Sequence, residues 1–169
     1  YHLRLALNFL VKLCNLTAQK YSESEFATSS DSDFIFNSET VVHQVELSLN
    51  DGSIAKQYAS PHLWKGYRGL STLPYLLQCA LMALEGWLIE YVDACGEDNH
   101  IEWIFNYLLK SSNSVMPTSV LASVALGFPE KVGRSAFPIL KCPQLYHLDL
   151  HRMTGEMGGS EPNWFGGML

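Results

Sequence analysis

The stretch YLLQCALMALEGWLIEYV, residues 75–92, decides the fold class of this chain. It is the longest apolar run in the sequence, and only Gln78, Glu85 and Glu90 interrupt it. A charge at the centre of a membrane-spanning helix costs roughly 2.5–3.5 kcal/mol on insertion scales, which disfavours a membrane span. Pro74 suits the first turn of a helix, because proline lacks an amide hydrogen that would go unpaired there. We therefore predict a buried helix.

Further helical patterns lie on both sides of this stretch. In residues 3–19 the polar residues recur every three or four positions, and everything between them is apolar or small. This spacing predicts a helix with one narrow polar stripe, buried on most of its circumference. More helical segments are expected at residues 100–110, 117–127, 129–141 and 143–156. Wide apolar faces predict a mainly α fold of stacked antiparallel helices, either solenoid-like or an irregular bundle.

Residues 40–59 change to the period of two that is typical of β-strands. One face of the first strand would carry Val41, His43, Val45, Leu47 and Leu49. An Asp51–Gly52 pair follows, which suits the tight turn of a β-hairpin because its central residues require positive φ. A lone hairpin is marginally stable in water, so we expect it to lie on the helices.

The composition is that of a folded domain with little charge. The chain has 169 residues, of which 47% are hydrophobic and 17% are charged, and its formal net charge is −6. The apolar content excludes intrinsic disorder, and the acidic balance argues against a direct nucleic-acid partner. Ordinary soluble domains have roughly 25% charged residues. The lower value here indicates that part of the surface is packed against something else.

We interpret residues 1–169 as a single helical segment of a larger protein. Its parts, by residue number, are a helix (1–20), a loop (22–39), a hairpin (40–59), a helical array (71–156) and an irregular tail (157–169). A helical pattern is already under way at Tyr1, whereas natural termini tend to be polar and frayed, although a processed mature protein is the alternative. The four cysteines form no CxxC pair, which favours a reduced, cytoplasmic setting.

One cluster of ionisable residues supports a metal-site hypothesis. On a strand, His147, Asp149 and His151 would line one face and could bind a metal ion. On a helix only the two histidines share a face, and Asp149 points elsewhere. Two nucleotide-binding motifs, GxxxxGK[ST] and GxGxxG, are missing from the sequence. We expect no cofactor in this segment, and Cys142 is the only plausible nucleophile.

The aromatic residues supply the candidate contacts. Residues 61–69, PHLWKGYRG, form an aromatic and basic turn whose rings either anchor the packing or contact a ligand or partner. The candidate ligand or partner contacts are Trp64, Tyr67, Arg68 and Trp164. We assign Trp87 and Trp103 to the core.

Three stretches carry a family resemblance: LWKGYRGLSTLPYLLQCALMALEGWL (63–88), LLKSSNSVMPTSVLASVALGFPEKVG (108–133) and LYHLDLHRM (145–153). They resemble the helical region C-terminal to the ATPase module in very large bacterial P-loop NTPases of the STAND type, some of which act in anti-phage defence. The resemblance implies an α-helical scaffold or sensor arm whose parent protein binds ATP elsewhere and recognises a protein trigger. The matching stretches are structural, so no functional residue is carried over.

The sequence therefore predicts a non-catalytic scaffold or sensor segment of a larger, NTP-dependent bacterial defence protein. Its partners would be other domains of the same chain or another protein, with no membrane and no direct nucleic acid, and the parent protein could form a homo-oligomer. The alternative function is a small metal-dependent hydrolase that uses His147, Asp149 and His151.

Overall fold

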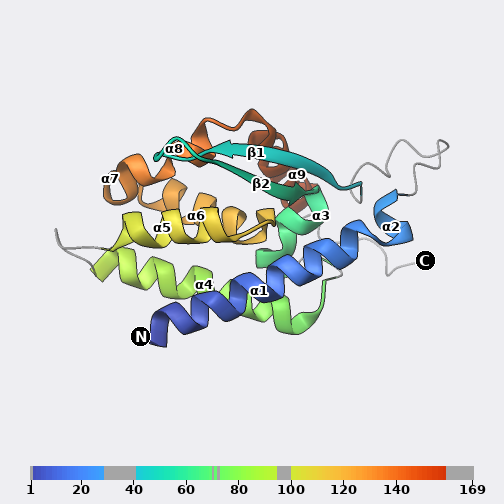
Figure 1. Cartoon of the computed structure of the whole chain (residues 1–169), viewed down its shortest axis with the longest axis horizontal. Coiled ribbons are helices and arrows are strands. Elements are labelled where there is room, and N and C mark those ends of the chain that lie inside the picture. The colour runs from blue at the N-terminus through green and yellow to red at the C-terminus, as the bar shows by residue number, and fades with distance from the viewer. Residues whose placement is uncertain (1, 29–40, 70, 72, 95–99, 159–169) are drawn as a thin grey trace, which may run out of the picture.

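The computed structural model describes residues 2–28, 41–69, 71, 73–94 and 100–158. They form, in order, α1 (His2–Ser22), α2 (Glu25–Thr28), β1 (His43–Ser48), β2 (Ile54–Ala59), α3 (Pro61–Trp64), η2 (Lys65–Arg68), α4 (Tyr75–Ala94), α5 (Ile101–Ser111), α6 (Val115–Gly127), α7 (Pro129–Val132), η3 (Gly133–Ala136), α8 (Phe137–Leu140) and α9 (Pro143–Gly158). The fold is mainly α, with one antiparallel hairpin in the described part of the chain (Figure 1). Both features confirm the predicted fold class.

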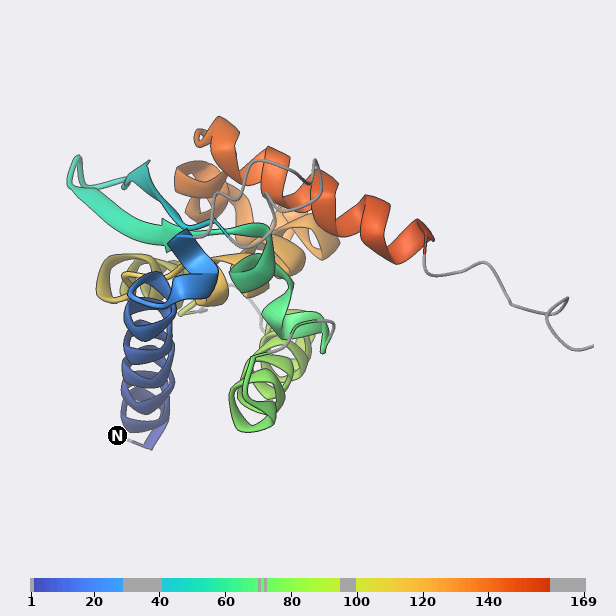
Figure 2. The ribbon, with the colours of Figure 1, turned by 90° about the vertical axis from the view of Figure 1, so that its right-hand side faces the viewer.

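The elements form three levels around α6. The hairpin and α9 lie on one side, α5 and α6 occupy the middle, and α1 and α4 lie on the other side (Figures 1 and 2). Residues 115–121 of α6 are all buried, because α3, η2, α4 and α5 all pack against this helix. Its N-cap is Ser114, whose side chain accepts a hydrogen bond from the Met116 amide.

The hairpin lies on the helices, as its small size requires. β1 and β2 pair antiparallel in the register Val45 with Gln57. The Gln57 side chain is buried, donates to the Leu109 carbonyl at 3.3 Å and accepts from Thr118 Oγ1 at 2.7 Å. The side chain of Gln57 therefore joins the hairpin to both α5 and α6. His43 and Val41 are exposed, so only the later part of the predicted apolar face is buried.

The structure corrects several predicted boundaries. The predicted loop at 22–39 contains α2, and the aromatic turn is helical, as α3 and η2. The single helix expected at 129–141 is three short pieces, because Gly133 has a positive φ of 53° and interrupts the helical path. At the far end α9 continues to Gly158, two residues into the predicted tail, and residues 159–169 lie outside the described part.

Two further assignments need correction. Trp103 is 42% exposed and stacks on Tyr107 at the surface of α5, so it is not a core residue. α1 buries only one face, although we expected it to be buried on most of its circumference. Among the described helices, none combines the length and apolar character needed to cross a membrane.

Gly133 provides a test of this break in the helical path. Its φ of 53° and ψ of −129° lie in a region that is strained for residues with a Cβ atom. We expect Gly133→Ala to lower the free energy of unfolding by about 1–3 kcal/mol. An added Cβ meets nothing within 4 Å, so the loss would come from the backbone alone.

The matched control is Gly127→Ala, at the end of α6. An added Cβ there also meets nothing within 4 Å, and the φ of Gly127 is not positive. We expect Gly127→Ala to be neutral or to stabilise by up to about 1 kcal/mol. Urea denaturation of both variants measures the difference, and equal losses would contradict the assigned conformation of Gly133.

Candidate interaction site

The aromatic candidates on α3 and η2 serve as packing anchors. Trp64 is 1% exposed and Tyr67 is 2% exposed, so neither side chain is presented on the surface. The Arg68 guanidinium lies 4.7 Å from the centre of the Tyr67 ring and reaches two carboxylates. The remaining candidate, Trp164, lies outside the described residues.

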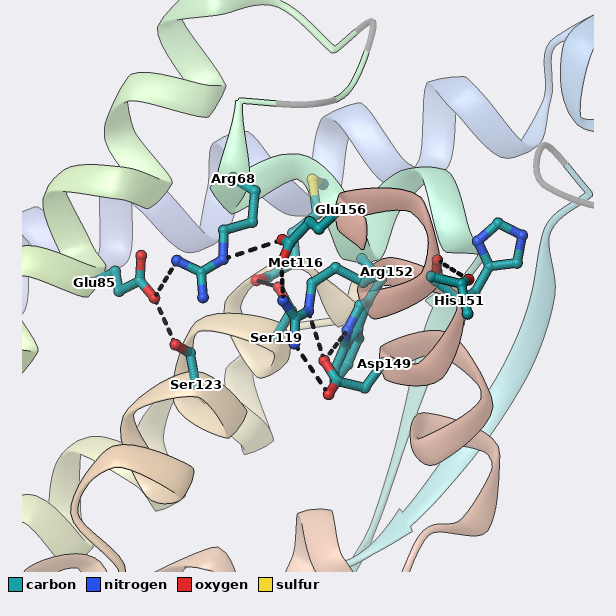
Figure 3. A network of polar contacts seen from close by, with 11 residues as sticks. Arg68, Glu85, Met116, Ser119, Ser123, Asp149, His151, Arg152 and Glu156 are labelled. Carbon is teal, nitrogen blue, oxygen red and sulfur yellow. Dashed lines mark hydrogen bonds and ion pairs between the residues drawn. The ribbon is translucent and has the colours of Figure 1, made fainter. Parts of the chain in front are cut away.

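A network of polar side chains joins α9 to the rest of the fold (Figure 3). Asp149 Oδ1 accepts from Trp64 Nε1 at 3.1 Å and from Arg152 Nε at 2.9 Å. Asp149 Oδ2 accepts from Arg152 Nη2 at 3.2 Å, and Arg152 Nη1 donates to Glu156 Oε2 at 2.7 Å. The three charged residues lie one turn apart on α9, and the contact with Trp64 ties that helix to α3.

The network continues from α9 into the helical body. Arg68 Nε lies 3.6 Å from Glu156 Oε1, and Arg68 Nη1 lies 3.6 Å from Glu85 Oε1. The same oxygen of Glu85 accepts from Ser123 Oγ at 2.6 Å. The chain of contacts therefore runs from α9 through η2 to α4 and α6.

The contacts between Asp149 and Arg152 favour the charged form of both residues. Burial alone would raise the pKa of Asp149, but the hydrogen bonds from Arg152 and Trp64 outweigh it and lower that pKa below its usual value. The hydrogen bonds from Arg152 to Asp149 and Glu156 raise the pKa of Arg152, against the effect of burial. Neither group exchanges a proton near neutral pH, so the arrangement acts as a clamp on α9.

The proposed metal ligands are not brought together. Asp149 turns toward Arg152 and Trp64, whereas His151 points away from it on the same helix (Figure 3). His147 is exposed on α9. Within the described ranges, no group of three or more His, Cys, Asp or Glu side chains is arranged to hold a metal ion.

Cys142 is poorly placed as a nucleophile. It is buried, and burial raises the pKa of its thiol against the opposing backbone hydrogen bonds of Leu145 and Gln144. A raised pKa lowers the fraction of reactive thiolate. Cys14 lies deeper still, and burial raises its pKa to about 12.

Two apolar hollows are the remaining candidates for recognition. The first, which we call the α6–α9 pocket, has a volume of about 360 Å³ and is lined by Trp64, Ala122, Ala125, Leu126, Pro129, Gly133, Ala136, Ile139, Leu140, Leu145, Tyr146 and Asp149. The second, the α1–α4 face, is a shallow groove lined by Leu3, Ala6, Leu7, Phe9, Leu10, Ala80, Ala83, Leu84 and Trp87. Sequence patterns missed both, because each combines residues from helices far apart in the chain.

No family model matches the sequence, and a search of curated proteins finds no match. The resemblance to STAND NTPases therefore stays a prediction, and the function is inferred from the structure.

Proposed function

We propose that this chain is a non-catalytic helical scaffold or sensor segment whose α1–α4 face binds an apolar helix. That helix would belong to another domain of the same polypeptide or to a protein partner. The support comes from the way α1 is oriented, from the lining of the groove and from the structural use of the charged network.

The orientation of α1 is the observation that carries the proposal. Two residues of its polar stripe bond to α5: Asn15 Nδ2 donates to the Ser111 carbonyl at 3.1 Å, and Asn8 accepts from the Tyr107 hydroxyl. The Asn113 amide donates to Asn15 Oδ1 at 2.9 Å. An amphipathic helix normally turns its apolar stripe to the core and its polar stripe to water. Here polar residues of α1 bond to α5 and its junction with α6.

α1 also exposes large apolar side chains next to its exposed polar ones. Phe9 is 65% exposed, and Leu5 and Leu16, which are one and two turns away, are exposed as well. Leu76 on α4 is also exposed and lies one turn before the groove residue Ala80. Fully burying a leucine or phenylalanine side chain stabilises by roughly 1.5–3 kcal/mol. A helix that covers these residues would therefore gain binding free energy from apolar burial.

The lining of the groove fits a helical partner. None of the residues that line the α1–α4 face is charged, and α1 and α4 run in opposite directions along it (Figures 1 and 2). Ala6, Ala80 and Ala83 are small, which lets a partner helix approach closely. Apolar surfaces of this kind, when contiguous and rimmed by polar residues, mark interaction sites.

The charged residues of the network on α9 have a structural role. Arg152 and Asp149 hold α9 in place, and their pKa directions keep both charged. The resemblance of the quoted stretches extends the proposal to a parent protein that is an NTP-dependent bacterial defence protein. In that setting the α1–α4 face would contact a neighbouring domain or the protein trigger.

Self-association tests the proposal, because another copy of the chain supplies apolar helices in a purified sample. We expect sedimentation velocity to show reversible association that grows with protein concentration, and Phe9→Glu to weaken it at least tenfold. A carboxylate in the groove would have to be desolvated without a partner.

The control is Ile54→Glu in the hairpin. Ile54 is 61% exposed, so this change also replaces one exposed apolar side chain by one carboxylate. We expect it to change the association constant less than twofold. A monodisperse monomer at every concentration, or an equal effect of both variants, would contradict the proposal.

A further inference from the structure

We propose that the α6–α9 pocket binds an uncharged, apolar small molecule of about the size of a few fused or linked rings. This inference does not depend on the proposed function, because it concerns a different surface. It rests on the volume of the pocket, on its small side chains and on the state of its polar groups.

The walls of the pocket leave a partly open apolar space. Ala122 and Ala125 from α6 and Ala136 from η3 form walls with short side chains, and the buried Trp64 forms the inner end. The volume of about 360 Å³ lies within the roughly 300–1,000 Å³ of typical small-molecule sites. Because the lining is mostly apolar, it favours an apolar occupant.

The polar side chains of the lining already have partners. Trp64 Nε1 donates to Asp149, and the Tyr146 hydroxyl donates to the Leu140 carbonyl at 2.6 Å. No hydrogen-bond donor of these side chains is left for a ligand to satisfy. A polar molecule would therefore lose its bonds to water on entering and gain few in return.

The charge of the pocket sets the charge of its occupant. Asp149 is the only charged residue of the lining, and its pKa is lowered, so it remains an anion at neutral pH. Its oxygens can only accept hydrogen bonds, so it offers none to an anionic ligand. The bonds from Arg152 already balance its charge, so a cation would gain little. These two facts together favour a neutral molecule.

Apolar side chains at the mouth of the pocket would contribute to the free energy of ligand binding. Leu126, Leu140 and Tyr146 line the pocket and are also exposed large apolar side chains. A bound apolar molecule would remove part of each from water, and each Å² of apolar area buried contributes about 25 cal/mol.

N-phenyl-1-naphthylamine and 8-anilino-1-naphthalenesulfonate provide a matched pair of fluorescent probes. Both have the same ring skeleton, but the first is neutral and the second carries a sulfonate. Titrated into the purified chain, the neutral probe should show saturable enhancement of fluorescence with one site per chain. The sulfonate should bind at least tenfold more weakly, because it would lose water and find no free side-chain donor in the lining. Equal binding of the two probes would overturn the charge argument.

Two substitutions of alanine by phenylalanine locate the site. Ala125→Phe fills the α6–α9 pocket and should weaken binding of the neutral probe at least tenfold. Ala83→Phe makes the same change in the α1–α4 face and should alter it less than twofold. The reverse pattern, or no saturable binding to the unmodified chain, would overturn the proposal. If Ala125→Phe weakened self-association of the chain but not binding of the probe, the proposal would also be overturned, because the occupant of the pocket would then be a protein side chain.

Folding of the variants is checked by circular dichroism and thermal unfolding. If Ala125→Phe does not fold, Ala122→Leu narrows the same pocket with a smaller side chain and should weaken binding as well. Independently, nuclear Overhauser effects between probe protons and the Ala125 methyl group are expected in the unmodified chain. Effects to the Ala83 methyl group alone would contradict the proposed site.

Discussion

Replacing Phe105 by alanine is expected to lower the free energy of unfolding by about 4 kcal/mol, the largest loss we expect from a single change. Phe105 is completely buried between α5 and its neighbours, and it is among the largest fully buried side chains of the core. Truncation removes its apolar contacts and leaves a cavity that a close-packed core cannot fill, which costs about 3–5 kcal/mol in other proteins. Urea denaturation followed by circular dichroism measures the loss.

Trp103→Ala on the same helix is the matched control. Trp103 is the larger side chain, but it is 42% exposed and contacts mainly the Tyr107 ring, with centroids 5.3 Å apart. We expect a loss of about 1 kcal/mol or less, the scale of one aromatic pair. If Trp103→Ala cost as much as Phe105→Ala, the assigned face of α5 would be wrong.

The second large effect concerns the clamp on α9. We expect Arg152→Leu to lower the free energy of unfolding by about 2–3 kcal/mol at neutral pH. The side chain of Arg152 is 10% exposed and that of Asp149 is 22% exposed, so removing the guanidinium leaves a half-buried carboxylate without its main partner. Breaking a fully buried pair costs about 3–5 kcal/mol, and partial exposure reduces that figure. The melting temperature should fall by roughly 5–10 °C.

The loss depends on pH, with a sign that follows from the lowered pKa of Asp149. A carboxyl group whose pKa is lowered by folding stabilises the protein above its unfolded pKa, and this contribution is lost as pH falls through the folded pKa. In Arg152→Leu the bonds that lower the pKa of Asp149 are lost and burial raises it, so acid protonates this carboxyl in the variant at a higher pH than in the unmodified chain. The difference between the unmodified chain and Arg152→Leu should therefore shrink by at least half between pH 7 and pH 3.

Lys56→Ala serves as the control for this charge effect. Lys56 pairs with Glu46 at 3.0 Å, but both side chains are more than half exposed. Exposed pairs contribute about 0–1 kcal/mol, so we expect a small loss. A loss for Arg152→Leu that does not change with pH would show that packing, and not the ion pair, makes the larger contribution.

Local sequence patterns predict much of the fold, because their physical causes are local. The period of two in residues 40–59 and the Asp51–Gly52 turn predict the hairpin, which the structure confirms. The predicted helix at 129–141 was wrong at Gly133, because the helical pattern that begins at Pro129 gives no sign of the positive φ of this glycine.

The neighbours of each helical face could not be predicted in this way. Trp64 and Asp149 are 85 residues apart in the chain, and Asn15 and Ser111 are 96 apart, yet each pair is hydrogen-bonded. A polar stripe on a helix indicates that these residues need partners, but it does not say whether water or another helix supplies them. For α1 the sequence pattern predicted that the polar stripe faces solvent. In the structure Asn15 of that stripe is hydrogen-bonded to α5 instead.

Photo-crosslinking tests the α1–α4 face most directly. The photoreactive amino acid p-benzoylphenylalanine replaces Phe9 in one sample and Ile54 in another, and the purified proteins are irradiated at concentrations where association occurs. We expect position 9 to give dimer-sized products whose crosslinks, mapped by mass spectrometry, fall on apolar helical residues of another copy. Position 54 should give few such products. Equal yields from both positions, or no dimer-sized product from position 9, would contradict the assignment of this face as a docking surface.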